Sequence, residues 1–405
     1  MRIPLLLGIS ALLFAQSALA ASFPEFVACV GASGKGAVCQ LNAGTYAVRA
    51  TIEVGRSNIV ITGTETVSPL DTVLRRAAGF EGPLLTDVEK AGTTLNSITI
   101  ENLTFDGNRA QNKSPYSDYA PDVSIFSVEN LAFINCEFNN SPNIGLGLYG
   151  AGTAGVTVDR CAFNDPVIYG LWSDATGNNS NITYEQCATK RFVKNVTVAN
   201  STFQNSGEPA ILGDMINLQI VNNVFTNNHS YSIPFDDDGG QIDLTVCTRN
   251  AVIWRNTFQS GAASPNGHVA DGIELHGTNI SLIDNIVKNN SGGGIFMDGA
   301  QHIYIANVDP TTGNFGNAQS GIEIAHSSSA FRLTEWITID FGNGAGNDQY
   351  GIWSDTSNTT PKEPVNHLTI ANSCLSEDKL GPTYLKNLGS DVKIQNNITS
   401  GCGPD

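Results

Sequence analysis

Three acidic residues and one histidine stand in similar short phrases, and their types are those of acid/base catalysis. Glu274 and His276 belong to Gly-Ile-Glu-Leu-His, Glu323 to Gly-Ile-Glu-Ile-Ala, and Asp243 to Gln-Ile-Asp-Leu. Side chains alternate along a β-strand, so an inward isoleucine makes the residue after it point outward. Asp243, Glu274 and Glu323 are therefore predicted to form one outward column, with His276 in a second column beside it.

The spacing of these acids suits cleavage of a glycosidic bond. Parallel strands lie about 4.8 Å apart, so Asp243 and Glu274 are expected to be adjacent, and Glu274 and Glu323 to be roughly 9.6 Å apart. These separations roughly bracket the ~5 to 5.5 Å of retaining and the ~6.5 to 9.5 Å of inverting glycosidase carboxylate pairs. Because crowded carboxylates repel, at least one should have a raised pKa and stay protonated, as a general acid requires. His276 could tune or relay that proton beside Asp298, which completes the predicted catalytic set.

Aromatic residues occupy the same outward positions in other copies of the phrase. Trp172, Phe296 and Trp353 flank the acids, and aromatic rings favour the C–H faces of sugars. Asp214 and Asp355 stand in the column of His276. We interpret these five residues as substrate-binding residues.

A run of three carboxylates precedes the strand of Asp243. Asp236, Asp237 and Asp238 are followed by two glycines, and hard oxygen ligands with a sharp turn could bind calcium. The ligand spacing is not that of an EF-hand, and a solvated acidic turn or further catalytic carboxylates are alternatives. Transition-metal catalysis looks poor because the six histidines are scattered. Calcium is thus the cofactor hypothesis, and no cofactor is firmly indicated.

The apolar part of the phrase predicts the scaffold that positions these residues. It alternates with a second phrase, seen as Val196-Thr-Val-Ala-Asn-Ser-Thr-Phe203 and Leu218-Gln-Ile-Val-Asn-Asn-Val-Phe225. Period-two alternation predicts strands, and the interruption near Asn predicts a tight bend. Each unit is therefore three short strands, with a minimum turn of about 22 residues and no room for amphipathic helices. We also expect a ladder of asparagines at the bend, at the following positions: Asn102, Asn135, Asn200, Asn222, Asn256, Asn285, Asn372 and Asn396.

With these phrases the chain resembles the pectin-lyase-like superfamily of right-handed parallel β-helices. The resemblance covers nearly the whole mature chain, including the opening segment from Cys39-Gln-Leu-Asn-Ala-Gly-Thr-Tyr46 to Ile59-Val-Ile-Thr-Gly63. It implies an all-β, single-stranded, three-sheet solenoid of about 10 to 12 rungs. It also implies that the Val-x-Val piece is the second sheet, the Thr-Phe piece the third, and the acid-bearing phrase the first. The superfamily hosts lyases, hydrolases, epimerases and adhesins, so the resemblance does not choose among them.

The ends, charge and cysteines indicate an exported protein. Residues 1–20 have an early arginine, an apolar run and Ala-Leu-Ala, as in a cleaved signal peptide; residues 21–405 are then expected to form one β-helix domain. The net charge of −17 and the absence of a basic cluster oppose nucleic-acid binding. No other stretch approaches the ~20 apolar residues of a membrane span. We expect a secreted or periplasmic protein that binds a polysaccharide or oligosaccharide.

Eight cysteines permit disulfide bonds in such a compartment. Two pairs could tie down the ends, Cys29 with Cys39 and Cys374 with Cys402. Two other pairs lie further inside the chain, where buried free thiols are the alternative: Cys136 with Cys161, on neighbouring rungs, and Cys187 with Cys247, in connections on one side.

Three functions stay open at this level. A glycoside hydrolase would use Glu274 with Asp243 or Glu323, although the motif set of polygalacturonases is absent. A polysaccharide lyase would need a cation near the uronate carboxylate, and Arg255 and Lys288 lie near the bend, away from the acids. A glycan-binding or adhesin β-helix would have uniform rungs, whereas long connections are expected here. Those between the third and first sheets are 226–240, 259–270 and 308–320, and those across the groove are 175–194 and 356–366.

Overall fold

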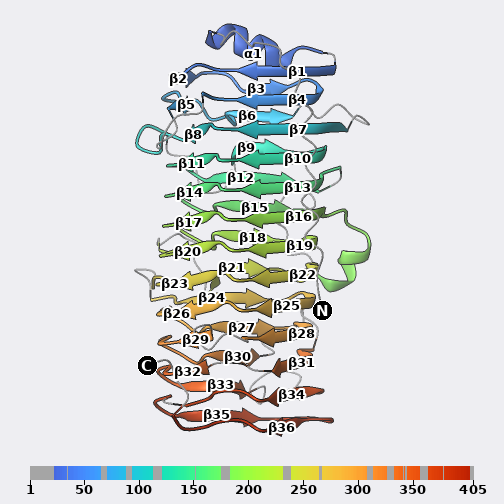
Figure 1. Cartoon of the computed structure of the whole chain (residues 1–405), viewed down its shortest axis with the longest axis vertical. Helices are drawn as coiled ribbons and strands as arrows, with labels where there is room; N and C mark the ends of the chain where they lie inside the picture. The colour runs from blue at the N-terminus through green and yellow to red at the C-terminus, as the bar shows by residue number, and fades with distance from the viewer. Residues whose placement is uncertain are drawn as a thin grey trace.

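The chain forms a coil with three parallel sheets, and the strands of each sheet stack from one end of the molecule to the other (Figure 1). The computed structural model describes residues 22–33, 35–64, 71–87, 94–112, 121–150, 152–174, 183–230, 239–263, 267–307, 313–325, 333–340, 342, 344–355, 364–376 and 378–401. In this part of the chain the three-sheet parallel β-helix predicted from the sequence is confirmed.

Each sheet takes every third strand except at the C-terminal end. The first sheet, which carries the predicted catalytic phrase, consists of β3 (Ile52–Val54), β6 (Leu85–Asp87), β9 (Pro121–Ile125), β12 (Ile144–Tyr149), β15 (Leu171–Asp174), β18 (Ile211–Gly213), β21 (Gly239–Leu244), β24 (Ala270–Leu275), β27 (Ile295–Asp298), β30 (Ile322–Ala325), β33 (Tyr350–Asp355) and β35 (Gly381–Lys386).

The second sheet follows the first around the coil. It consists of β1 (Lys35–Gln40), β4 (Ser57–Thr62), β7 (Leu95–Glu101), β10 (Val128–Ile134), β13 (Ala154–Asp159), β16 (Val193–Ala199), β19 (Met215–Val221), β22 (Arg249–Trp254), β25 (Thr278–Ile283), β28 (Gln301–Ala306), β31 (Glu335–Asp340), β34 (Leu368–Ala371) and β36 (Lys393–Gln395).

The third sheet has the shortest strands. It consists of β2 (Gly44–Val48), β5 (Thr72–Arg76), β8 (Thr104–Asp106), β11 (Glu137–Asn139), β14 (Ala162–Asn164), β17 (Thr202–Gln204), β20 (Val224–Thr226), β23 (Thr257–Gln259), β26 (Ile286–Lys288), β29 (Gly313–Phe315) and β32 (Gly344–Ala345). Up to β34 the three sheets take strands in turn, after which β35 follows β33 and β36 follows β34. The prediction that 308–320 is one connection between the third and first sheets is wrong, because β29 lies within it. The buried central residue of β29 is Asn314, whereas the two preceding third-sheet strands have Phe258 and Val287 there, so the apolar signal is missing.

Stacked side chains fill the interior. Isoleucine, valine and leucine of all three sheets form one continuous buried core. In the third sheet, phenylalanines stack with ring centroids 4.5 Å apart between Phe138 and Phe163 and again between Phe163 and Phe203. Burial of this size stabilises the coil mainly through the hydrophobic effect. The scaffold can therefore hold outward side chains at fixed positions.

The asparagines at the bend form two ladders rather than the one predicted. Asn200 and Asn222 have positive φ and are linked by a 2.8 Å hydrogen bond from Asn222 Nδ2 to Asn200 Oδ1. Asn256 and Asn285, expected in that same ladder, lie one position later and are buried. There Asn256 Nδ2 donates to Asn285 Oδ1 and to the carbonyl of Ile220. Unpaired buried backbone groups are costly, so this inner ladder satisfies the bend from within.

One helix caps the first coil, contrary to the expectation of none. α1 (Phe23–Gly31) packs Phe26 and Val30 onto the core. The sequence signal for it was Ser22-Phe-Pro-Glu25: the backbone N–H of Ser22 donates to the Glu25 carboxylate, and a proline stands in the first turn. Such a pattern is typical of a helix N-terminus. No described helix is long and apolar enough to cross a membrane.

The cysteines follow the expected pairing in part. Cys29 bonds to Cys39, which ties α1 to β1, and Cys187 bonds to Cys247. Cys136 and Cys161 are buried on neighbouring rungs but remain free thiols. Their Sγ atoms lie near backbone carbonyls, among them that of Phe133 for Cys161. Cys402 lies outside the described residues.

Candidate functional site

The outward column of the first sheet has the order predicted from the sequence. The register pairs Asp243 with Glu274, Glu274 with Phe296, Phe296 with Glu323, and Glu323 with Trp353. All five residues are partly exposed, whereas the aliphatic residues beside them are buried. The alternation of the strands thus places acids and aromatics on one accessible line.

His276 links two of the acids. Its Nε2 lies 2.9 Å from Oε1 of Glu274 and 3.8 Å from Oδ1 of Asp243. Its Nδ1 lies 2.7 Å from the carbonyl oxygen of Asp298, which can only accept, so Nδ1 carries a proton. Burial alone would lower the pKa of His276, but the hydrogen bond and charge of Glu274 and the charge of Asp243 together raise it to about 10. At neutral pH His276 is therefore a cation that pairs with Glu274.

Asp243 differs from Glu274 in its hydrogen bonding. Its Oδ1 is buried and accepts no hydrogen bond. Burial, followed by the repulsion of Glu274, raises the pKa of Asp243 to about 8, although the charge of His276 acts in the other direction. These surroundings favour the protonated form of Asp243 beside the Glu274–His276 ion pair.

Glu323 shares its surroundings with Asp271, an acid that the sequence reasoning missed. Burial raises the pKa of Glu323, and the hydrogen bond from the backbone N–H of Ser320 to its Oε1, 3.1 Å long, only partly compensates. A Cβ on Gly293 would lie 3.1 Å from Oε1 of Glu323 and 3.2 Å from Oδ1 of Asp271. Because glycine has no Cβ, the carboxylates of Glu323 and Asp271 can both lie close to position 293. Asp271 stands in the phrase Asp-Gly-Ile-Glu, and this signal was available in the sequence.

Glu208 and His229 are the other neighbours that sequence reasoning missed. His229 Nε2 lies 3.6 Å from Oε2 of Glu208, and His229 is fully buried. A Cβ on Gly239 would be 3.6 Å both from His229 Nε2 and from Oε2 of Glu274. His229 and Glu274 thus both lie next to Gly239. His229 stands in a turn between sheets, outside the repeated phrase, so no periodic signal pointed to it.

The sequence profile described as "Right handed beta helix region" matches residues 90–309. The chain belongs to this β-helix family. No curated protein sequence matches the chain.

Solved structures show the same fold at low identity. The A-module of the mannuronan C-5 epimerase AlgE4 from Azotobacter vinelandii is 14% identical over 91% of this chain and 90% of that one, with a TM-score of 0.62. The surface protein and adhesin PfbA from Streptococcus pneumoniae is 13% identical over 93% of this chain and 91% of that one, with a TM-score of 0.55. The GH87 α-1,3-glucanase from Streptomyces thermodiastaticus is 13% identical over 90% of this chain and 64% of that one, with a TM-score of 0.51.

The second outward column of this β-helix protein is buried. Asp214 and Asp298 are 6% and 1% exposed. Oδ1 of Asp214 accepts hydrogen bonds from Thr245 Oγ1 and from the backbone N–H of Cys247, so it fastens the turn after β21. Burial also raises its pKa. Asp355, at the edge of the column, is partly exposed and lies 3.4 Å from Lys386 Nζ. The predicted substrate-binding residue Asp214 is therefore buried, and its hydrogen bonds stabilise the turn after β21.

The aromatic residues of the first column differ in exposure. Trp172 is 2% exposed and packs edge-on against Tyr149 at 5.5 Å, within a cluster that includes Ile168 and Tyr169. A ring that is covered in this way offers no face to a sugar. Phe296 and Trp353 are partly exposed on either side of Glu323, so their predicted role in binding stays a prediction.

A metal ion could use part of the same site. Single ligand atoms of Asp243, Glu274 and His276 all lie within 4.8 Å of one another. The hydrogen bond from His276 Nδ1 to a carbonyl would orient the ring for a cation bound at Nε2. Metal and proton compete for Nε2, so the two states exclude each other. The predicted calcium ligands Asp236, Asp237 and Asp238 lie outside the described residues.

Proposed function

We propose that this protein is an exported enzyme that hydrolyses a neutral polysaccharide, with Glu274 and Glu323 as its acid/base pair. The observation that carries the proposal is the exposed line Glu274, Phe296, Glu323 in the first sheet. The two acids are two rungs, or roughly 9.6 Å, apart along the sheet. With side-chain freedom this separation fits the ~6.5 to 9.5 Å of inverting glycosidases, which leave room for a water molecule.

The two carboxyl groups have environments that separate their roles. Burial raises the pKa of Glu323, which favours the protonated form that a general acid needs. Glu274 forms an ion pair with His276 and is therefore suited to be the general base. A sugar ring over Phe296 would have one carboxyl group at each end. Glu323 would protonate the leaving oxygen while Glu274 takes a proton from the water that attacks the anomeric carbon.

Asp243 defines a second mechanism for the same reaction. Its carboxylate and that of Glu274 lie within 4.8 Å of each other, which is near the ~5 to 5.5 Å of retaining pairs and leaves no space for water between them. In that mechanism Glu274 would be the nucleophile and Asp243 the acid. The partial burial of Asp243 and the lack of a hydrogen bond at Oδ1 favour a tuning role instead.

The charges near the site favour a neutral substrate over a uronate. No Lys or Arg among the described residues forms an ion pair with Asp243, Glu274 or Glu323. His276, the cation of the site, is already engaged by Glu274. A lyase or epimerase needs a cation to neutralise the uronate carboxylate, so these activities rank second. Both activities stay as alternatives, because an epimerase is among the solved structures with this fold.

Export and saccharide chemistry have independent support. Two disulfide bonds are typical of an oxidising compartment. The fold neighbours include a glucanase, an epimerase of a polysaccharide and a surface adhesin. The third candidate is a non-catalytic binding protein. Such a protein has no need of carboxyl groups with raised pKa values, such as those of Asp243 and Glu323, so these groups favour an enzyme.

A panel of polysaccharides tests the proposal. The mature protein is incubated with neutral glucans, galactans and mannans and with alginate and polygalacturonate, and both reducing ends and absorbance of unsaturated products are measured. Reducing ends without absorbance are expected from a neutral glycan. Absorbance would identify a lyase, and silence on every substrate would leave the binding protein. Glu323→Gln and Asp243→Asn then separate the two mechanisms, because only the general acid should be indispensable.

A further inference from the structure

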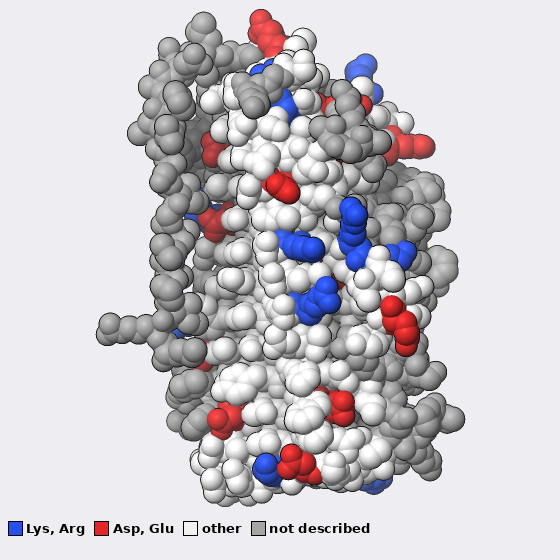
Figure 2. All heavy atoms as spheres, turned by 90° about the vertical axis from the view of Figure 1, so that its right-hand side faces the viewer, with Lys and Arg blue, Asp and Glu red and all other residues white. Residues whose placement is uncertain are grey.

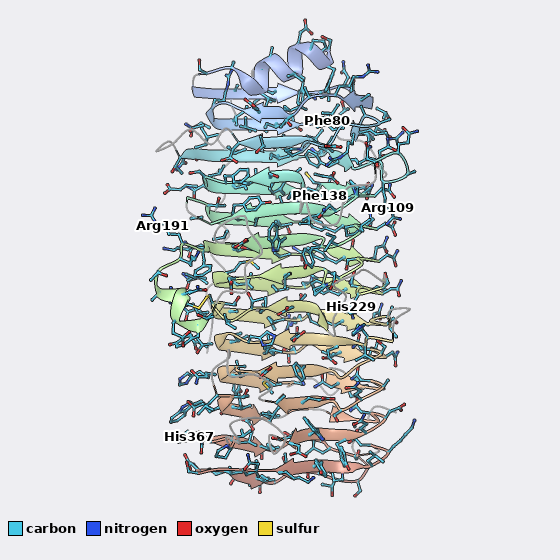
Figure 3. All side chains as sticks on the ribbon, turned by 180° about the vertical axis from the view of Figure 1, so that it is seen from behind. Phe80, Arg109, Phe138, Arg191, His229 and His367 are labelled. Carbon is cyan, nitrogen blue, oxygen red and sulfur yellow. A yellow bond between two sulfur atoms is a disulfide. The ribbon has the colours of Figure 1, made fainter. Side chains whose placement is uncertain are left out.

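A second accessible cluster lies away from the acids, on the second sheet. A pocket of about 330 Å³ is lined by the following residues: His302, Ile303, Tyr304, Trp336, Thr338, His367, Thr369 and Asp391. They come from β28, β31 and β34 and from the residues just before β34 and β36. The pocket lies on the second sheet, whereas Glu274 lies on the first. Figure 3 places His367 and His229 on opposite sides of the coil.

The pocket interrupts a regular column of the repeat. Near the start of successive second-sheet strands, Asn195, Asn217, Asn250 and Asn279 have positive φ. The side chain of each of the last three donates to the asparagine before it, as in the 2.7 Å bond from Asn279 to Asn250. The register carries this column on to His302, Trp336 and His367. The column of asparagines that ends at Asn279 is thus continued by the rings of His302, Trp336 and His367.

The aromatic residues are unusual occupants of this position. His302, Trp336 and His367 have φ of 55°, 59° and 53°. Asparagine tolerates this left-handed region, whereas for a bulky residue such as tryptophan it is an outlier. Stacking partly offsets the strain, since the rings of Trp336 and His367 are 3.6 Å apart and nearly parallel. Because strained backbone destabilises the folded chain, its presence here indicates that these residues have a function such as ligand binding.

The lining has the chemistry of a sugar site. Trp336 is 44% exposed and Tyr304 39% exposed, and Thr338 and Thr369 follow in the outward positions of the next two strands. Aromatic surface with hydroxyl groups and the Asp391 carboxylate can contact the C–H faces and hydroxyls of a pyranose. No Lys or Arg is among the described residues that line it. Lys393 lies at its edge, where Nζ is 3.4 Å from Oδ1 of Asp391, so its charge is already paired. Figure 2 shows acidic and basic residues scattered over this side of the coil, with no large patch of one charge in the lower part.

We infer that this pocket is a second, non-catalytic binding site for a neutral saccharide. Trp336 lies on the same coil as Glu323, with β30 leading into β31. A chain bound there would keep the polysaccharide near the acidic line without taking part in the chemistry. The substrate class rests on the proposed function, but binding itself does not require catalysis.

Two substitutions restore the residues that the repeat uses elsewhere. Trp336→Asn returns the ladder residue, and Tyr304→Ser returns the residue at the matching position of β25, Ser281. Both suit the local backbone, so the fold should be retained. Tyr184→Ser removes an equally exposed aromatic residue outside the pocket and is the matched control.

The experiment measures binding separately from turnover. Full-length mature protein carrying Glu274→Gln is tested by affinity electrophoresis in gels that contain laminarin, dextran, soluble starch, barley β-glucan or galactomannan. We expect at least one glycan to retard it, and the Tyr304→Ser/Trp336→Asn pair to weaken that binding roughly tenfold or more. The Tyr184→Ser control should bind like its parent.

The outcomes distinguish this site from the proposed active site. If the pocket variant binds every glycan as well as the control does, or if no glycan retards the parent, the inference is wrong. Dissociation of a dimer in the pocket variant, measured by light scattering, would assign the pocket to a second copy of the chain instead. Failure of the hydrolase proposal appears only as lack of turnover in the Glu274-containing protein, and leaves the binding result readable.

Discussion

The two outward columns of the first sheet differ in exposure although they alternate on the same strands. Asp243, Glu274, Phe296 and Glu323 are partly exposed, whereas Asp214, His276 and Asp298 are buried. The exposed column offers groups to a substrate, and the buried column fixes their charge and the turns beside them. Equal spacing in the sequence therefore does not give equal roles.

Removal of the central exposed acid should have the largest effect. We expect Glu274→Gln to lower the rate on the natural glycan by roughly 10²- to 10⁴-fold, because the general base is lost. The free energy of unfolding should also fall near neutral pH, because the buried His276 cation loses the carboxylate that pairs with it. Turnover kinetics and thermal unfolding check both. Normal turnover would place the active site elsewhere.

The buried histidine should affect pH dependence more than the rate at a single pH. The pKa of His276 is raised to about 10 and that of Asp243 to about 8 in the folded protein. Each then binds a proton that the unfolded chain has released, His276 between about pH 6.5 and 10 and Asp243 between about pH 4 and 8. Stability is therefore expected to fall as pH rises through these ranges.

Thermal unfolding at several pH values tests this expectation. His276→Gln should flatten the loss of stability above about pH 6.5, and Asp243→Asn should flatten it below about pH 8. If wild type and His276→Gln lose stability equally between pH 7 and 10, His276 is not the cation that pairs with Glu274.

A buried acid should affect stability without affecting chemistry. Asp214→Ala leaves the hydroxyl of Thr245 and the backbone N–H of Cys247 without their acceptor, at a cost of about 1 to 3 kcal/mol. The matched control is Asp355→Ala, which breaks a partly exposed ion pair with Lys386 worth about 0 to 1 kcal/mol. Denaturant unfolding measures both. Equal costs would contradict the contrast between the columns.

Chelation should have the smallest effect. With His276 protonated, Asp243, Glu274 and His276 should hold no cation near neutral pH, so EDTA should leave the rate unchanged. If Asp236, Asp237 and Asp238 bind calcium, EGTA should lower the melting temperature, and replacing all three by Asn should remove that response. A loss of rate in EDTA that zinc restores would instead assign a metal to Asp243, Glu274 and His276.

Much of the site geometry follows from local pattern. The alternation of aliphatic residues predicted the register from Asp243 to Trp353, because a shift by one residue would turn every isoleucine outward. Asp271 lies in β24, and its phrase Asp-Gly-Ile-Glu could have pointed to it. Glu208 and His229 could not be ranked in this way, because they reach the site through turns, whose paths depend on contacts between distant segments.

By itself the sequence determined the three-strand period, the inward core and the order of residues along each column, since these depend on side-chain alternation and spacing. Only the tertiary structure decided which column is accessible, that Trp172 is covered, and that Cys136 and Cys161 stay unbonded. It also showed that an asparagine ladder becomes the His302, Trp336, His367 stack. Exposure, disulfide pairing and ring stacking are set by three-dimensional neighbours, and a one-dimensional pattern does not contain them.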